Sequence, residues 1–467
     1  MELYSGNENY KLYHGNMLDM SEVVDKNTID SIVCDPPYEL NFMWKWWDNS
    51  WIAFQKETWK KCLEVLKPWW YLLAFGGSRT YHRIACAIED AWFEIRDCIM
   101  WLYGSWFPKS MNIWLAIDKR WATSISRFWG YLRGVLKERN MTYSDLAKHF
   151  PSKTWWITGC VHNRIEWKNM PTLEQFNKIC EILDLPFDKL EEAEREVIWS
   201  KKTNLTVYQN IWDRNISWEV DITAPSTELA KQRAWWGTAL KPSYEPIIVA
   251  RKPCEWSCTD NVIKYWVGWI NIDECRVWWE WGRFPANTIF TYDEKDFEEV
   301  CWWLLSNNEY RYYYCAKASK KDRDEGLENF EIKGAKELLN REENSDWASW
   351  NGKYSSWNAF AWSWAPKKNI HPTVKPTELM QYLVRLVTPN GWTVLDPFNW
   401  SGSTWKAVMY ENKDRNKNYK YIWIELTEEY LPIAKARIEY AIWNTEQKES
   451  ENEKESVELK EKSLFDF

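Results

Sequence analysis

The sequence predicts an α/β fold, in which helices cover both faces of a doubly wound sheet of mostly parallel strands. Short apolar runs alternate with segments of helical periodicity over residues 29–102, and the same alternation returns over residues 377–440. The largely apolar run at residues 29–34 ends directly before two prolines, as expected for a buried strand from which the chain leaves the sheet.

The first half of this fold is expected from residues 10–102. Apolar residues recur every three or four positions over residues 52–66, which predicts a helix with one buried face. Residues 71–75 are continuously apolar and precede two glycines, which predicts a buried strand followed by a turn. In chain order we expect a strand and turn over residues 10–19, strands over 29–34, 71–75 and 93–102, and helices over 52–66 and 80–91.

The second half of the fold is expected near the other end of the chain. It comprises a helix over residues 377–386, a strand over 392–398 that runs into a turn of small residues and a helix, a strand over 421–425, and a closing helix over 428–440.

Residues 128–195 differ in character, because they contain several short helical patterns separated by tight turns. This arrangement is similar to a helix-turn-helix module. Residues 128–170 carry seven basic and three acidic side chains, against a formal charge of −8 for the whole chain. We therefore expect this insertion to contact DNA through Lys153, His162, Asn163 and Arg164; the alternative is a helical insertion that only packs on the sheet.

Composition bounds the class of protein. The 467 residues include no apolar run near the ~20 residues that span a membrane, and no basic and apolar leader. The 11 cysteines are scattered and odd in number, as is usual for reduced cytoplasmic thiols. Cys254 and Cys258 lie close together, but their spacing matches no usual zinc-ligand pair, so no metal site is predicted.

Tryptophan is unusually frequent. The chain has 39 Trp and 16 Gly, although average usage of about 7% Gly predicts roughly 33 glycines in this length. Trp69 and Trp70 lie where a turn should precede a strand, and Trp92 lies where a helix-ending glycine is usual. We infer that many glycine positions of a parent sequence carry Trp here; an aromatic interaction surface is the alternative.

Two loops carry the chemistry. Asp35-Pro36-Pro37-Tyr38 follows the strand at residues 29–34, and its prolines hold an extended loop at the carboxyl edge of the sheet. A carboxylate, a backbone carbonyl and an aromatic ring in fixed relation can grip a flat base that carries an exocyclic amine. The second loop, residues 396–404 with Glu425 on the next strand, suits a nucleoside-containing ligand, because a helix N-terminus and an acid after a strand bind such groups.

These motifs resemble one family. Asp35–Tyr38, His371-Pro372-Thr373-Val374-Lys375-Pro376, and Asp396-Pro397-Phe398 before Ser401-Gly402-Ser403-Thr404 resemble the DNA methyltransferases that modify an exocyclic amino nitrogen. Their order, with the catalytic loop first and the cofactor loop last, is that of the permuted β class. Residues 241–248 and 282–287 further resemble the adenine-methylating members. The resemblance implies a Rossmann-like methyltransferase fold.

The resemblance also implies S-adenosylmethionine as cofactor. Its candidate contacts are Asp396, Phe398, Ser401, Gly402, Ser403, Thr404 and Glu425, with His371 and Lys375 from the preceding motif and Asp19 near the adenine end. A helix N-cap is the alternative role for Asp19. Trp400, Trp405 and Trp423 stand at or beside positions where the family has glycine. We therefore expect this chain to bind S-adenosylmethionine weakly or not at all, with impaired activity.

The implied substrate is double-stranded DNA, from which the target base is flipped out. The Asp35 carboxylate and the Pro36 carbonyl would accept the two amine hydrogens, Pro37 would stiffen the loop, and Tyr38 would stack on the base. N6 of adenine is the expected target, because Asp rather than Ser begins the motif. N4 of cytosine is one alternative, and a DNA-binding protein without catalysis is another.

The resemblance divides the chain into five expected parts. They are a catalytic half of the methyltransferase domain (1–127), the helix-turn-helix-like insertion (128–195), a target-recognition region that completes the sheet in part (196–368), a cofactor-binding half (369–444) and a charged tail (445–467). It implies the cytoplasm of a bacterial or phage-infected cell, and it leaves open a homodimer and a partner restriction endonuclease.

Overall fold

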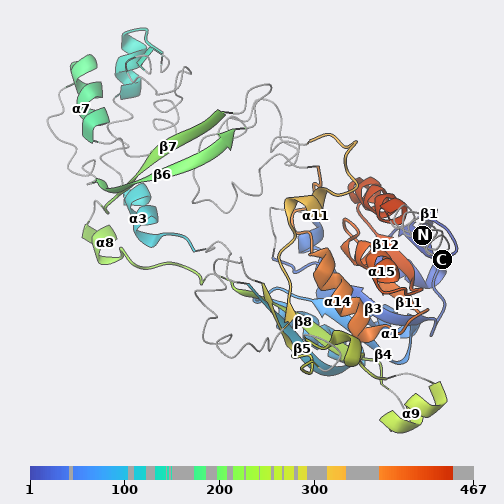
Figure 1. The fold of residues 1–467 in the computed structure, drawn as a ribbon. Coiled ribbons are helices and arrows are strands. Elements are labelled where there is room, and N and C mark those ends of the chain that lie inside the picture. The colour runs from blue at the N-terminus through green and yellow to red at the C-terminus, as the bar shows by residue number, and fades with distance from the viewer. Residues whose placement is uncertain are drawn as a thin grey trace, which may run out of the picture. The chain divides into compact units, whose positions relative to one another are not determined.

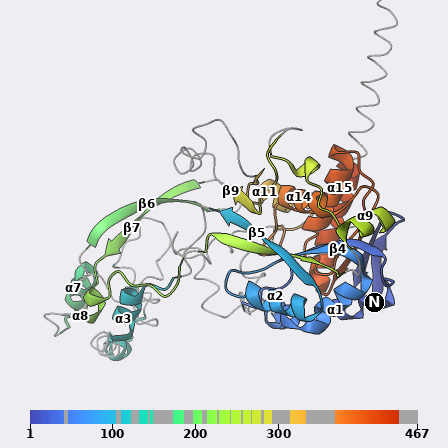
Figure 2. The ribbon, with the colours of Figure 1, turned by 90° about the horizontal axis from the view of Figure 1, so that it is seen from below.

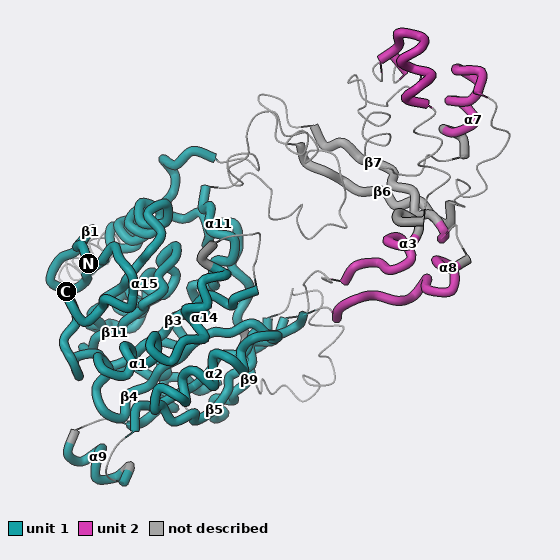
Figure 3. Tube along the Cα trace, turned by 180° about the vertical axis from the view of Figure 1, so that it is seen from behind, with its two compact units in different colours: residues 1–106, 242–351, 362–467 teal, residues 107–241, 352–361 magenta. Residues whose placement is uncertain are grey.

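The structure is a computed structural model, and it divides into two compact units (Figure 3). Unit 1 comprises Met1–Trp106, Pro242–Asn351 and Trp362–Phe467, and unit 2 comprises Phe107–Lys241 and Gly352–Ala361. The described residues are 1–40, 46–103, 110–121, 132–142, 145, 146, 149, 173–185, 197–207, 214–225, 228–240, 242–253, 257–265, 268–277, 282–291, 313–332 and 368–444.

Unit 1 contains a ten-stranded sheet in the order β1-β2-β12-β11-β3-β4-β8-β5-β9-β10 (Figure 1). The pairs β1–β2, β4–β8 and β8–β5 are antiparallel, and all the others are parallel. The predicted α/β class and mostly parallel sheet are therefore confirmed. The strands are β1 Glu2–Gly6, β2 Tyr10–His14, β3 Ile29–Cys34, β4 Leu66–Phe75, β5 Glu94–Tyr103, β8 Tyr244–Arg251, β9 Thr288–Thr291, β10 Tyr313–Tyr314, β11 Thr393–Asp396 and β12 Lys420–Glu425.

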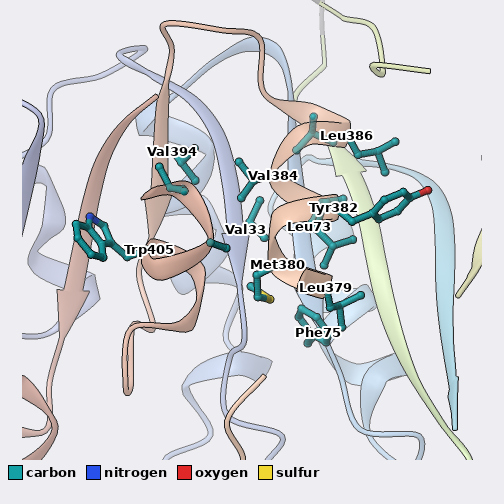
Figure 4. Close-up of a cluster of buried hydrophobic side chains, with 14 of the residues drawn as sticks. Val33, Leu73, Phe75, Leu379, Met380, Tyr382, Val384, Leu386, Val394 and Trp405 are labelled. Carbon is teal, nitrogen blue, oxygen red and sulfur yellow. The ribbon is translucent and has the colours of Figure 1, made fainter. Parts of the chain in front are cut away.

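Helices cover both faces of this sheet, α1 and α2 on one face and α14 and α15 on the other (Figure 2). Successive strand side chains point to opposite faces. Val33 and Leu73 therefore join the buried cluster under α14 and α15 (Figure 4), whereas Ile32 and Leu72 join the cluster under α1 and α2. Each such buried side chain contributes roughly 1.5–3 kcal/mol. The helices are α1 Lys56–Val65, α2 Tyr81–Asp90, α9 Cys258–Tyr265, α11 Lys320–Asp324, α14 Thr377–Val387 and α15 Ser403–Asp414, and residues 431–444 are also helical.

Asp322, in α11, fixes the start of α14. Its Oδ2 accepts a 3.1 Å hydrogen bond from the Thr377 backbone N–H, and its Oδ1 lies 2.7 Å from Lys406 Nζ in α15. A buried ion pair then joins the two helices near the other end of α14, where Arg385 Nε donates to Glu411 Oε2 at 3.0 Å. These contacts hold the segment just before α14, which includes Lys375, against the sheet.

The end of α2 shows the backbone conformation that the sequence suggested. Trp92 has φ 73°, its N–H bonds to Glu89 O at 2.9 Å, and the Phe93 N–H bonds to Ile88 O at 3.3 Å. This is the Schellman pattern, in which the left-handed position usually holds glycine. Trp51, Trp69 and Trp400 also have positive φ. That these positions once held glycine stays a prediction.

Two local details differ from the sequence-based expectations. The strand expected at residues 71–75 begins earlier, because β4 starts at Leu66 and the register against β3 shifts between Leu66 and Tyr71. The short 3₁₀ helix η1, Met17–Glu22, is capped by Asn16, whose Oδ1 accepts from the Leu18 N–H, so Asp19 lies inside the helix and is not its cap. The other 3₁₀ helices are η3 Trp46–Asn49, η4 Ile52–Phe54, η5 Asp273–Cys275 and η7 Glu428–Tyr430.

Unit 2 contains a two-stranded antiparallel sheet and short helices. Its elements are β6 Val197–Val207, β7 Arg214–Thr223, α3 Ile113–Trp121, α7 Leu173–Ile182 and α8 Glu228–Gln232, and residues 132–138 are helical. The expected groove-facing residues Lys153, His162, Asn163 and Arg164, and the tail at 445–467, lie outside the described residues. Within the described segments, no helix combines the length and apolarity needed to cross a membrane.

Candidate active site

The two chemical loops meet at one edge of the sheet. Strands β3 and β11 are parallel neighbours, with Leu395 opposite Ile32. Their carboxyl ends therefore point the same way, and the loops after Cys34 and after Asp396 emerge side by side. A hydrogen bond connects the loops, because Trp400 Nε1 donates to the Asp35 backbone carbonyl at 2.6 Å. Segments more than 350 residues apart thus form one site.

Asp35 is a buried carboxylate beside a buried ammonium group. Its Oδ2 accepts a 2.7 Å hydrogen bond from Lys375 Nζ, which lies 3.4 Å from Glu245 Oε2 as well. Burial raises the pKa of Asp35, and the Lys375 charge opposes that rise. Within the described part of the chain, Asp35 Oδ1 has no hydrogen-bond partner. Asp35 therefore presents one carboxyl oxygen that no described residue bonds, while a cation holds the other.

Tyr38 is held at both ends. Its hydroxyl donates to Glu245 Oε2 at 3.0 Å, and its backbone carbonyl accepts from Thr80 Oγ1 at 2.8 Å. The Tyr103 hydroxyl lies 3.5 Å from Glu245 Oε1. Glu245, Thr80 and Tyr103 were not among the residues predicted for the site. Only residues 241–248 carried a signal, as a segment similar to the family and without an assigned role.

The loop after β11 is built around Asp396. This carboxyl accepts from the Phe398 N–H at 3.0 Å and from Thr404 Oγ1 at 2.6 Å, and burial raises its pKa to about 7. Gly402, with φ 77°, precedes α15. Asn399 is 3% exposed, and neither polar atom of its amide has a partner among the described residues. Such an amide is uncommon inside proteins, where buried polar groups are usually hydrogen-bonded.

Glu425 lies at the end of β12, on the other side of β11. It accepts hydrogen bonds from the Trp400 N–H at 2.5 Å and from the Thr427 N–H at 2.7 Å. Burial raises its pKa to about 8. Asp35, Asp396 and Glu425 thus lie at the carboxyl ends of three neighbouring strands, and all three have a raised pKa. Several perturbed carboxyl groups in one place are typical of a functional site.

Comparison with known proteins agrees with this geometry. A family model described as DNA methylase, of the N6/N4 methyltransferase kind, matches residues 29–436. The chain belongs to the DNA methylase family.

Individual relatives of this methylase are distant. Type II methyltransferase M2.DpnII of Streptococcus pneumoniae is 28% identical over 164 residues, which are 35% of this chain and 50% of that protein, so the chain spans about half the length of this curated relative. Among solved structures, M1.HpyAVI is 12% identical with a TM-score of 0.34, over 92% of this chain and 98% of that one. The cytosine-N4-specific PvuII DNA methyltransferase is 12% identical with a TM-score of 0.37, over 92% and 86%.

Among the described residues of the methylase, a small and a larger cavity lie beside these loops. One of about 10 Å³ is lined by Asp35, His371, Lys375, Asp396, Ser401, Ser403, Thr404 and others. A second of about 260 Å³ is lined by residues of η1, η4, β12 and the loops around them, Glu425 among them. Phe398 and Trp400 line both. Asp19 lies in η1 beside Met17 and Leu18, which line the larger cavity, but is not part of that lining.

The other tryptophans near the cofactor loop lie elsewhere. Trp405 and Trp423 are fully buried in the core under α14 and α15, and the Trp423 ring is stacked on Tyr10 with centroids 5.6 Å apart. Neither lines either cavity. Trp400 is therefore the tryptophan of these three that shapes the site.

Proposed function

We propose that this DNA methylase transfers a methyl group to the N6 amine of adenine in double-stranded DNA. The observation that carries the proposal is the buried Asp35 carboxylate, whose Oδ1 has no partner in the described part of the chain, at the loop that adjoins the cofactor loop. A carboxylate oxygen accepts hydrogen bonds and cannot donate them, so a ligand N–H is the group that suits it.

On the base side, each residue has a distinct role. The Asp35 carboxylate and the Pro36 carbonyl accept the two amine hydrogens of a flipped base, which localises the nitrogen lone pair. Tyr38 stacks on the base, and its hydrogen bonds to Glu245 and Thr80 support that orientation. Lys375 supports the ionised state of Asp35 because it stands 2.7 Å away. Pro37 keeps the loop extended.

S-adenosylmethionine supplies the methyl group in this family. The larger cavity suits its nucleoside part, because Glu425 offers a carboxyl group to ribose hydroxyls and apolar side chains such as Met17 and Leu18 offer surfaces to a flat ring. Asp19 is the proposed polar group near the adenine end. The loop residues Asp396, Phe398, Ser401, Gly402, Ser403 and Thr404, with His371, suit the amino-acid part.

The cavity beside this loop offers little space for the amino-acid part. The smaller cavity has about 10 Å³, which is space for about one water molecule. The Trp400 indole lines both cavities, and the Trp400 backbone has a positive φ of 51°, which glycine adopts most easily. We therefore propose that Trp400 impairs cofactor binding and turnover, and that Trp400→Gly relieves the block.

On this proposal, DNA contacts the insertion at residues 128–195 as well as the active site. The excess of basic residues over 128–170 supports phosphate contact there, through Lys153, His162, Asn163 and Arg164. On this proposal residues 1–127 and 369–444 form the catalytic and cofactor-binding halves of one domain, and residues 196–368 add the target-recognition region.

A methyl-transfer assay tests this proposal. The Trp400→Gly protein would be incubated with tritiated S-adenosylmethionine and DNA of mixed sequence, followed by nucleoside analysis of the product. We expect N6-methyladenine; N4-methylcytosine would overturn the choice of base, and no label would favour a non-catalytic DNA-binding protein. Adding Asp35→Ala should abolish transfer while DNA binding persists, and retained turnover would remove Asp35 from the mechanism.

A further inference from the structure

Two cavities of unequal size adjoin in the site of this methylase. The larger cavity of about 260 Å³ and the smaller one of about 10 Å³ share Phe398 and Trp400 in their linings. We call the cavity of about 260 Å³ the open compartment and the cavity of about 10 Å³ the closed compartment. An extended ligand with groups in both would have to pass the Trp400 indole.

The Trp400 side chain is firmly held in this position. Its Nε1 donates to the Asp35 carbonyl at 2.6 Å, and its ring centroid lies 5.3 Å from that of His371 and 6.1 Å from that of Tyr430. The Trp400 backbone N–H is bound to Glu425. The residue is 9% exposed. The Trp400 indole is thus held through its backbone, its ring nitrogen and its ring contacts, and it borders both compartments.

The open compartment has the lining of a nucleoside site. Met17, Leu18, Ile424 and Leu426 contribute apolar surface for a flat heterocycle, and Glu425 contributes a buried carboxyl group that can bond ribose hydroxyls. Small-molecule sites typically combine a mostly apolar lining with a few placed polar groups.

The closed compartment has polar residues and almost no space. Asn399 and Asp35 both line it. In the described part of the chain, neither amide atom of Asn399 has a hydrogen-bond partner, and neither has Asp35 Oδ1. These groups suit a charged amino-acid tail, but about 10 Å³ admits about one water molecule. A ligand with such a tail must either leave it outside the site or displace the indole.

We propose that this chain binds purine nucleosides without an amino-acid substituent, such as adenosine, in preference to S-adenosylmethionine. This inference rests on the proposed function for the identity of the open compartment as the nucleoside side of the cofactor site. It adds that Trp400 disfavours S-adenosylmethionine relative to adenosine, while the nucleoside site itself still binds ligand. On this proposal the preference for adenosine depends on the Trp400 side chain, so a substitution of Trp400 alone should reverse the preference.

Calorimetric titration of the full chain with adenosine and with S-adenosylmethionine tests the preference. We expect adenosine to bind at least tenfold more tightly to the unchanged chain. Trp400→Gly should raise the affinity for S-adenosylmethionine at least tenfold and change that for adenosine less than threefold. Trp92→Gly, which removes an exposed tryptophan at the end of α2, is the matched control and should leave both affinities as they are.

A second variant tests whether adenosine binds in the open compartment, without altering Trp400. Leu18→Trp adds bulk in the open compartment and should reduce adenosine affinity at least tenfold in a protein whose circular dichroism matches the unchanged chain. Equal or tighter binding of S-adenosylmethionine by the unchanged chain, or no detectable adenosine binding, would overturn the inference. If Trp400→Gly gains S-adenosylmethionine binding but methylates no DNA, the proposed function fails and this inference stands.

Discussion

Trp400 Nε1 donates a 2.6 Å hydrogen bond to the backbone carbonyl of Asp35. The bond ties the loop after β11 to the loop after β3, directly before the Pro36 carbonyl that is proposed to receive an amine hydrogen. The position of the base-binding loop therefore depends on a residue of the cofactor loop. A change at Trp400 is expected to affect both sides of the site.

Lys375→Met tests the role of the buried ammonium group. Lys375 is the cation that opposes the burial-driven rise in the pKa of Asp35. Its loss should raise that pKa further, so Asp35 stays protonated to higher pH. Carbon-13 NMR titration of labelled Asp35, identified by its absence in Asp35→Asn, measures the shift. Lys67→Met removes a more exposed Lys–Asp pair, with Asp30 at the other end of β3, and should leave the Asp35 titration unchanged.

Glu245→Gln should shift the same titration in the opposite direction. Glu245 places a second negative charge near Asp35 and contributes to its raised pKa. With a neutral amide in its place, the pKa of Asp35 should fall toward the ordinary carboxyl range. The same NMR titration measures this change. A rise in the pKa of Asp35 in both Lys375→Met and Glu245→Gln would show that loss of packing, rather than the change of charge, dominates.

Stability should decrease from acid to mildly alkaline pH because of two buried carboxyl groups. Burial raises the pKa of Asp396 to about 7 and that of Glu425 to about 8, whereas unfolded carboxyl groups titrate near pH 4. Between these values the folded protein binds protons that the unfolded chain has released. The free energy of unfolding therefore falls as pH rises from about 5 to about 8.

Urea unfolding at pH 5 and at pH 8 measures this effect. Glu425→Gln removes one of the two titrations and should narrow the difference in free energy of unfolding between the two pH values. Glu2→Gln, at an exposed position on β1, should keep the full difference. An unchanged difference in Glu425→Gln would show that this carboxyl group titrates normally in the folded protein.

Trp92→Gly should stabilise the protein. Trp92 is 74% exposed and has φ 73°, so its side chain buries little surface while its backbone is strained. Relief of a left-handed conformation contributes about 1 kcal/mol, partly offset by the greater freedom of glycine in the unfolded chain. Trp92→Ala keeps the Cβ atom and should gain nothing. Equal free energies of unfolding for Gly and Ala variants would argue against strain at this position.

Local patterns carried most of the fold prediction. The expected helix at residues 377–386 and strand at 421–425 agree with α14 and β12 within one residue at each end. Strand β8 shows where such reasoning stops, because nothing in its eight residues specifies that it runs antiparallel between β4 and β5. That placement brings Glu245 to Tyr38 and Lys375. For the same reason, Glu245 could not be assigned from the sequence to the cluster that it forms with Asp35, Tyr38 and Lys375.

The place where the chain leaves and rejoins the sheet of unit 1 has a consequence for changes of sequence during evolution. The chain leaves the sheet after Tyr103 in β5 and returns before Tyr244 in β8, and these strands are neighbours joined at this point by a 2.8 Å bond from the Tyr103 N–H to Ser243 O. The segment between these two strands therefore leaves the sheet and returns to it at the same place. Loop closure depends only weakly on length, so the segment between these strands is a natural place for changes of sequence and length while the sheet of unit 1 keeps its register.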